Sequence, residues 1–190
     1  MPMPKALPAL AQGALAELSG VLAAMPAEAA EPLITAILSS KRIALHGLGR
    51  EGLQMKGLAM RLFHLGLDAH VVGEMTMPAL GPGDLLIVSA GPGDFESIAA
   101  LMKCAKTAGA RNAVVTAQAQ GGAAKRADAV LVIPAQTMAD DRGAAAKSVL
   151  PMGSLYEAAM MFVFEVLVLQ LRDRLGETPE TMRVRHTNVE

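Results

Sequence analysis

Residues 43–52 read Ile-Ala-Leu-His-Gly-Leu-Gly-Arg-Glu-Gly, a short apolar run that leads directly into a glycine-rich turn. Residues 53–65 follow with apolar side chains at helical spacing, so the turn joins a strand to a helix. In α/β proteins this position binds anions, because free backbone N–H groups and the helix dipole point at the ligand. The stretch therefore predicts a binding crevice at the carboxyl end of a parallel strand.

A second strand and turn repeat this plan later in the chain. Residues 85–89 are a continuous apolar run, of the kind buried on both faces of a parallel sheet, and residues 90–94 read Ala-Gly-Pro-Gly-Asp. Asp94 is predicted to cap the helix that follows. If the two strands are neighbours at a topological switch point, both turns open into one crevice.

The remaining patterns complete an α/β arrangement. Helices are predicted over residues 5–25, 31–39, 53–65, 95–108 and 155–175, and strands over residues 42–46, 69–73, 85–89, 112–116 and 129–133. This order predicts a three-layer α-β-α sandwich with a five-stranded parallel sheet. We expect one domain over residues 1–190, with N-terminal helices in 1–40, the core in 41–176 and a C-terminal tail in 177–190.

Composition narrows the class of protein. Hydrophobic residues make up 52% of the chain and charged residues 18%, and the net charge is −1. Such a charge gives no electrostatic footprint for nucleic acid or an anionic membrane, whereas the apolar excess predicts self-association. The single cysteine, Cys104, fits a reducing compartment. Residues 1–5 lack the apolar run of a signal peptide, and the apolar stretch 160–171 is too short to span a bilayer, so we expect a cytoplasmic protein.

The first turn also matches a dinucleotide-binding fingerprint, Gly47-x-Gly49-x-x-Gly52. Glu74 ends the second predicted strand, about 20 residues further on, where a ribose-binding carboxylate would lie. Two helices precede the first strand, however, and the second glycine-rich turn has no role in this scheme. Stabilisation by NAD or NADP would support this alternative.

Four separated segments, in the same order, resemble the 6-phospho-3-hexuloisomerase branch of the sugar isomerase (SIS) domain family. They are residues 47–66, residues 72–87, the Leu-Pro-Met-Gly-Ser-Leu-Tyr-Glu segment at 150–157, and Arg-His-Thr-Asn at 185–188. The resemblance implies the SIS fold, with its strands in flavodoxin-like order. It also implies isomerisation of a phosphosugar, such as 3-hexulose 6-phosphate to fructose 6-phosphate, with no metal or redox cofactor. It also implies a homotetramer, or a dimer, with sites shared between subunits.

Isomerisation through an enediol needs a base above the enediol plane and groups that move protons at the two oxygens. Glu157 is the best candidate for the base, because a carboxylate in the first turns of a helix is favoured by the dipole and can be tuned by burial. His186 is the second catalytic candidate, and it reaches a site only if the tail packs on a neighbouring subunit. His64 faces either the same crevice or a subunit contact, whereas His46 and His70 are interpreted as structural.

The candidate substrate-binding residues come from the two turns. They are Gly49, Arg50, Glu51, Ser89, Gly91, Asp94 and Ser97. The turns depart from the family, which has Ser where Glu51 stands and Ser-Gly-Ser-Gly-x-Thr in the second loop. Pro92 removes an N–H donor and Asp94 adds a charge, which weakens the case for a dianionic phosphate.

Three interpretations remain open at this point. In the first, the protein is an isomerase whose extra carboxylates face away from the substrate. In the second, it is an isomerase of a sugar that lacks the phosphate, and the hydroxyls of that sugar bind Glu51 and Asp94. In the third, it is a non-catalytic sugar-binding protein. The fold itself does not separate them.

Overall fold

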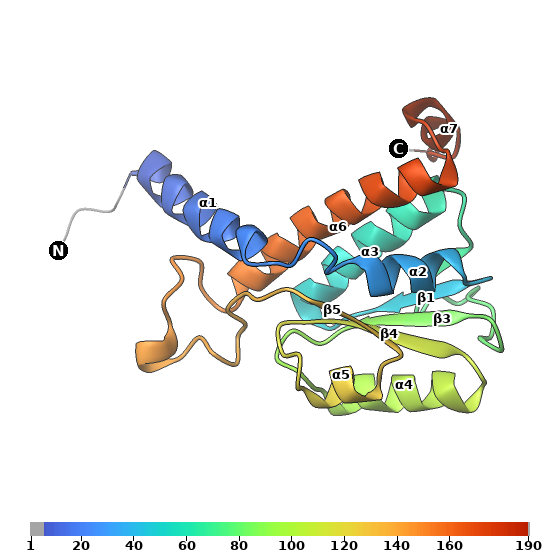
Figure 1. The fold of residues 1–190 in the computed structure, drawn as a ribbon, viewed down its shortest axis with the longest axis horizontal. Coiled ribbons are helices and arrows are strands. Elements are labelled where there is room, and N and C mark those ends of the chain that lie inside the picture. Colours follow the sequence, from blue (N-terminus) through green and yellow to red (C-terminus); the bar gives the residue numbers. More distant parts are fainter. Residues whose placement is uncertain (1–5, 190) are drawn as a thin grey trace.

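The computed structural model describes residues 6–189. Its elements, in chain order, are α1 (Leu7–Ala23), α2 (Glu31–Leu38), β1 (Ile43–His46), α3 (Gly49–His64), β2 (Ala69–Val71), β3 (Leu85–Ser89), α4 (Glu96–Thr107), β4 (Arg111–Thr116), α5 (Gly122–Arg126), β5 (Ala129–Val132), a 3₁₀ turn (Gly143–Ala145), α6 (Ser154–Leu175) and α7 (Pro179–Val184). Figure 1 shows α1 and the segment of residues 135–150 projecting on one side of the sheet, and α7 lying at the far end of α6.

The five strands form one parallel sheet in the order β2-β1-β3-β4-β5. Ile43 pairs with both Ala69 and Leu85, so β1 lies between β2 and β3 in register. After β1 the chain continues to β2 on one side, and after β3 it continues to β4 on the opposite side, although β1 and β3 are neighbours in the sheet. The predicted sheet, its parallel pairing and its flavodoxin-like order are therefore confirmed, and the switch point lies between β1 and β3.

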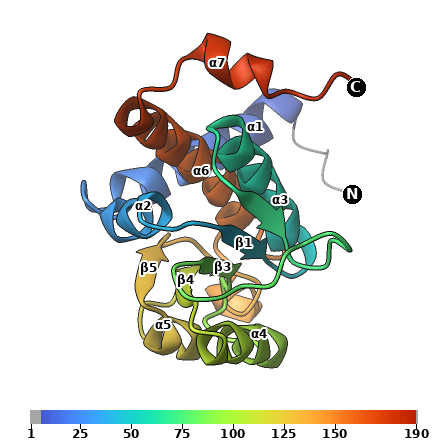
Figure 2. The ribbon, with the colours of Figure 1, turned by 90° about the vertical axis from the view of Figure 1, so that its right-hand side faces the viewer.

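Two apolar clusters cover the two faces of the sheet. Helices α1, α2, α3 and α6 pack on one face, where Leu45 and Ile87 point, and α4 and α5 pack on the other, where Ala44 and Val88 point (Figure 2). All five residues of β3 are buried, because side chains that alternate along a strand meet helices on both sides. This is the predicted three-layer sandwich.

Helix α6 is the one described helix whose length and apolar composition would allow it to cross a membrane. In the fold it is a core helix, since Met160, Leu167 and Leu171 are fully buried against the sheet and the neighbouring helices. Its first turn lies at the carboxyl edge of the sheet, so it delivers Glu157 to the place where the two glycine-rich turns end.

Three local predictions were wrong in their details. Helix α3 begins at Gly49 rather than Leu53, so half of the glycine-rich turn is the first turn of the helix. Asp94 does not cap α4, whose N-cap is Phe95. The tail contains a further helix, α7, which starts at a capping box between Thr178 and Thr181 with a proline at its first position.

Candidate active site

A crevice of about 350 Å³ opens at the carboxyl ends of β1 and β3, where a doubly wound sheet binds its ligands. It is lined by Leu48, Gly49, Arg50, Glu51, Pro92, Phe95, Thr137, Met138, Met152, Gly153, Tyr156 and Glu157. Larger hollows of about 640 Å³ and 630 Å³ lie elsewhere, beside β2 and between α4 and α5. The crevice is lined by residues of both glycine-rich turns and those two hollows are not, so we take it as the candidate active site.

Glu51 forms the floor of this crevice. It is the third residue of α3 and is 8% exposed. Its Oε2 atom accepts hydrogen bonds from the Ser89 hydroxyl at 2.5 Å and from the Gly91 backbone N–H at 3.0 Å. Burial raises the pKa of Glu51, and these two hydrogen bonds oppose the rise. Glu51 therefore lies inside the site and links the first glycine-rich turn to the second.

Glu157 stands on the other side of the crevice, in the first turn of α6. Arg50 Nε lies 2.9 Å from its Oε2 atom, and Arg50 Nη1 donates to Ser154 Oγ at 2.7 Å. Burial raises the pKa of Glu157, Arg50 opposes the rise, and the charge of Glu51 adds to it. The ion pair is not aligned as a hydrogen bond, so Glu157 Oε2 has no hydrogen-bond partner among residues 6–189. A carboxylate held in this way can take up a proton.

Position 91 requires a glycine, because Glu51 and Tyr156 approach the backbone closely there. A Cβ atom at this position would lie 2.7 Å from the Tyr156 ring and 2.8 Å from Glu51 Oε1. Tyr156 is buried, its hydroxyl lies beside Ser89 without a hydrogen bond of normal geometry, and burial raises the pKa of its phenol well above the usual range. The phenol group therefore stays neutral, and the ring forms the buried wall of the crevice.

Five of the predicted substrate-binding residues meet at the crevice, and two do not. Gly49, Arg50 and Glu51 line it, and Ser89 and Gly91 contact Glu51 beneath it. Asp94 turns away and pairs with Arg126 of α5. Ser97 is an exposed residue of α4 that does not line the cavity.

His186 lies far from Glu157 within the chain. Its ring stacks on His64, with 5.3 Å between the ring centroids, at the C-terminal end of α3. Arg50 is at the other end of that helix, about 20 Å away at the rise of an α-helix. The predicted meeting of His186 with Glu157 therefore requires a second copy of the chain.

The long segment before α6 supplies a wall that the sequence did not predict. Thr137 and Met138 line the crevice, as do Met152 and Gly153 at the start of α6. Gly153 has a φ of 78° and Met152 a φ of 57°, so the chain turns through the left-handed region before the helix begins. The glycine at 153 was the only local signal for this turn, because the partners of Thr137 are set by tertiary packing.

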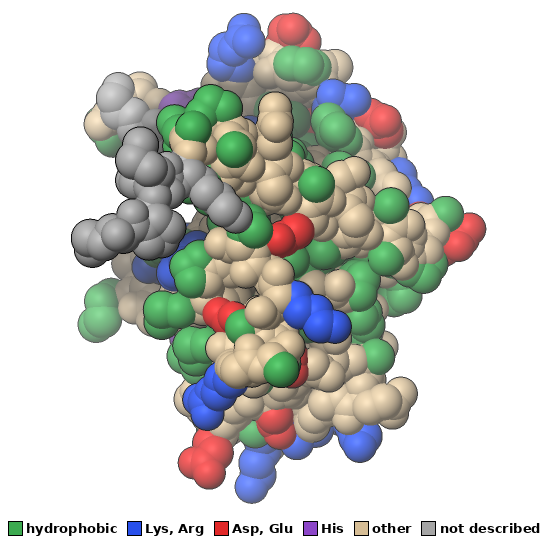
Figure 3. Space-filling model, turned by 90° about the vertical axis from the view of Figure 1, so that its left-hand side faces the viewer, with side chains coloured by type: hydrophobic (Ala, Val, Ile, Leu, Met, Phe, Trp, Pro, Cys, Tyr) green, Lys and Arg blue, Asp and Glu red, His purple; other side chains and the backbone are tan. Residues whose placement is uncertain are grey.

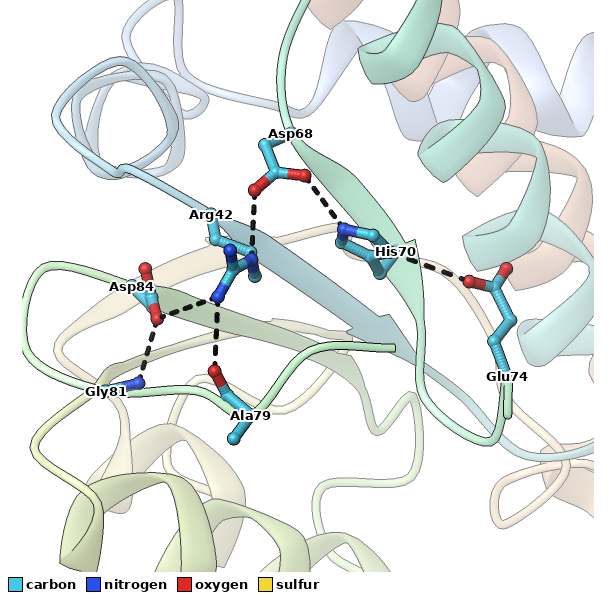
Figure 4. A network of polar contacts seen from close by, with 7 residues as sticks. All are labelled: Arg42, Asp68, His70, Glu74, Ala79, Gly81 and Asp84. Carbon is cyan, nitrogen blue, oxygen red and sulfur yellow. Dashed lines mark hydrogen bonds and ion pairs between the residues drawn. The ribbon is translucent and has the colours of Figure 1, made fainter. Parts of the chain in front are cut away.

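Glu74, the carboxylate of the dinucleotide alternative, belongs to a different network. His70 lies between Asp68 at 2.8 Å and Glu74 at 3.8 Å, and Asp68 also binds Arg42 (Figure 4). These groups tie the starts of β1 and β2 together on the edge side of the sheet. Glu74 lines the hollow beside β2 and not the glycine-rich crevice, so the structure gives the dinucleotide alternative no support.

No protein-family model matches the chain. It is 36% identical over 176 residues to 3-hexulose-6-phosphate isomerase of Bacillus subtilis, covering 93% of this chain and 95% of that one. A Methanococcus jannaschii protein, whose crystal structure infers a molecular function of 3-hexulose-6-phosphate isomerase, superimposes with a TM-score of 0.78 at 26% identity over 97% and 98% of the two chains. The sugar isomerase domain of an RpiR transcription factor from Sphaerobacter thermophilus shares the fold, with a TM-score of 0.70 at 22% identity over 95% and 96% of the two chains.

The fold is that of a sugar isomerase (SIS) domain. The resemblance noted in the sequence is thereby confirmed. At this identity and coverage, the chain belongs to the 3-hexulose-6-phosphate isomerase family.

Proposed function

We propose that this chain isomerises a hexulose phosphate, converting a 3-keto sugar to the 2-keto sugar by proton transfer through an enediol. The observation that carries the proposal is the pairing of Glu157 with Arg50 in a half-enclosed crevice at the switch point. The names of the relatives support the same reaction class.

In this scheme Glu157 takes the proton from the hydroxyl-bearing carbon next to the carbonyl and returns it to the former carbonyl carbon. Burial suits this role, because it raises the pKa of Glu157 and makes the carboxylate a stronger base. Arg50 stabilises the negative charge that develops on the substrate oxygens. The proton that leaves one oxygen and the proton that reaches the other need a second group, for which His186 is the candidate.

We propose that a neighbouring subunit supplies His186, in a homotetramer or dimer. Supporting this, the outward faces of α3 and α6 carry exposed apolar side chains. Each is between 47% and 61% exposed: Leu53, Met60, Phe63, Met161, Phe162, Val166 and Leu169. Hydrophobic side chains also lie on the side of α1 and residues 135–150 (Figure 3). Light scattering gives the mass of the assembly, and a monomer would contradict this part of the proposal.

We keep the single domain over residues 1–190 and a cytoplasmic location as predictions, the latter on the single cysteine. Limited proteolysis tests the prediction of one domain, since one domain yields a single resistant core.

A second candidate function is sugar binding without turnover. It is favoured by the position of the Glu51 carboxylate, which accepts hydrogen bonds from two donors that could otherwise bind the phosphate.

Proton exchange tests the isomerase directly. The chain is incubated with 3-hexulose 6-phosphate in heavy water, and NMR follows deuterium at carbon and the appearance of the 2-keto sugar. We expect exchange with the wild type, a fall of about a hundredfold or more in Glu157→Gln, and no change in Asp173→Asn, which alters an exposed carboxylate at the far end of α6. No exchange with the wild type, or equal exchange in Glu157→Gln, would overturn the proposal.

A further inference from the structure

Two hydrogen-bond donors at the end of β3 are already occupied by a carboxylate of the chain itself. The Ser89 hydroxyl and the Gly91 N–H converge on one atom, Glu51 Oε2. Ser89 is fully buried and Glu51 nearly so. A hydroxyl and a backbone N–H that converge in this way are donors suited to an oxygen of an anionic ligand. We refer to Ser89 Oγ and Gly91 N as the β3 seat.

The charges around the β3 seat oppose a second anion. Among the residues that line the crevice, Glu51 and Glu157 carry negative charges and Arg50 carries the positive one. Arg50 is paired with Glu157 and not with Glu51. Like charges at contact distance repel strongly where burial limits screening by water, and a dianion feels the repulsion twice over. A phosphate on the seat would have to displace Glu51 or bear this repulsion.

Glu51 retains a free acceptor for a neutral partner. Both hydrogen bonds go to its Oε2 atom, and Oε1 makes none within residues 6–189. The absence of a side chain at Gly91 leaves Oε1 uncovered, since a Cβ there would lie 2.8 Å from it. A sugar hydroxyl can donate to a carboxylate oxygen in this position, whereas an ionised phosphate oxygen cannot.

We propose that Glu51 determines substrate specificity by filling the β3 seat, so that this end of the crevice binds a sugar hydroxyl and excludes a phosphate group. A phosphorylated sugar then binds with its phosphate away from the β3 turn. This inference rests on the proposed function only in taking the crevice as the sugar site.

Inorganic phosphate is the probe that tests the seat. Isothermal titration at about pH 8, well above the ordinary pKa of a carboxyl group, compares the wild type with Glu51→Gln and Glu51→Ser. The first variant removes the charge and keeps an acceptor for Ser89, and the second empties the seat. Glu96→Gln is the matched control, because it neutralises an exposed carboxylate at the start of α4. Thermal unfolding verifies that each variant is folded.

We expect Glu51→Ser to bind phosphate at least about tenfold more tightly than the wild type, Glu51→Gln to lie between them, and Glu96→Gln to match the wild type. Equal phosphate affinity in all four proteins would overturn the proposal, as would weaker phosphate binding by Glu51→Ser than by the wild type. Because this readout needs no turnover, it is independent of the exchange experiment. An inactive wild type with the expected phosphate pattern would remove the isomerase proposal and leave the role of Glu51 standing.

Discussion

The two glycine-rich turns follow neighbouring strands and each carries one acidic residue, yet the two carboxylates have opposite surroundings. Glu51, after β1, is buried and accepts hydrogen bonds from the turn after β3. Asp94, after β3, is exposed and pairs with Arg126 on the outer face of α5. One charge is part of the crevice and the other is part of the surface.

The difference comes from where each helix starts. Glu51 lies within the first turn of α3, so its side chain is directed by the helix toward the neighbouring strand end. Asp94 precedes the first residue of α4 by two positions and lies in the loop, where it packs against Gly122. A shift of a few residues in the start of a helix thus decides whether an acidic residue changes the chemistry of a site.

The two arginines beside the turns, Arg50 in the first turn and Arg126 paired with Asp94 of the second, give the largest expected contrast. Arg50→Met removes the only positive charge among the crevice residues, so we expect kcat/KM to fall about a hundredfold in the isomerase assay. The acid limb of the pH profile should also move to higher pH, because Arg50 lowers the pKa of Glu157. Arg126→Met is the control, because Arg126 lies on α5 and pairs with Asp94 of the second turn. Equal losses in the two variants would mean that the crevice has no special electrostatic role.

Gly91→Ala tests the close approach of the two turns. The added Cβ would meet Tyr156 and Glu51 at less than 3.0 Å, so we expect a loss of about 1–3 kcal/mol in the free energy of unfolding. Gly81→Ala is the matched control, because nothing lies within 4 Å of its Cβ position. Denaturant unfolding of both variants measures the difference. A Gly91→Ala protein as stable as the control would show that the walls separate easily.

The sheet and part of the crevice could be predicted, because they depend on local patterns. Short apolar runs that end in glycine identify β1 and β3, and parallel strands place Glu51, Ser89 and Gly91 at one edge. The direction of Asp94 could not be predicted, since its partner Arg126 lies on a five-residue helix with little periodicity. The Thr137 wall depends on tertiary packing of a long loop, which leaves no repeating pattern in the sequence.

The pH dependence of stability should differ in sign between the buried carboxylate of Glu51 and that of Glu177, which pairs with Arg185. Burial raises the pKa of Glu51 in the folded state, so the folded protein binds this proton more tightly than the unfolded chain does. The free energy of unfolding therefore falls as pH rises above about 4.5. Glu51→Gln should therefore melt a few degrees above the wild type at neutral pH and equally with it at about pH 4. Calorimetry across this range measures the difference.

Glu177 provides the control of opposite sign. Hydrogen bonds from Arg185 lower its pKa to about 2, so its contribution is present above the ordinary pKa of a glutamate and is lost as pH falls. Glu177→Gln should be less stable than the wild type at neutral pH and converge with it toward strong acid. If the stability of the two variants relative to the wild type changed with pH in the same direction, this would contradict the assignment of Glu51 as a buried charge without a cation.

Asp94→Asn should give the smallest effect. The variant breaks an exposed ion pair with Arg126, and such pairs contribute at most about 1 kcal/mol. The carboxylate does not line the crevice, so the KM for the sugar should change less than in Glu51→Gln. Denaturant unfolding and steady-state kinetics measure both quantities. A KM shift in Asp94→Asn as large as that in Glu51→Gln would contradict the contrast between the two carboxylates, because it would mean that the second turn moves inward when sugar binds.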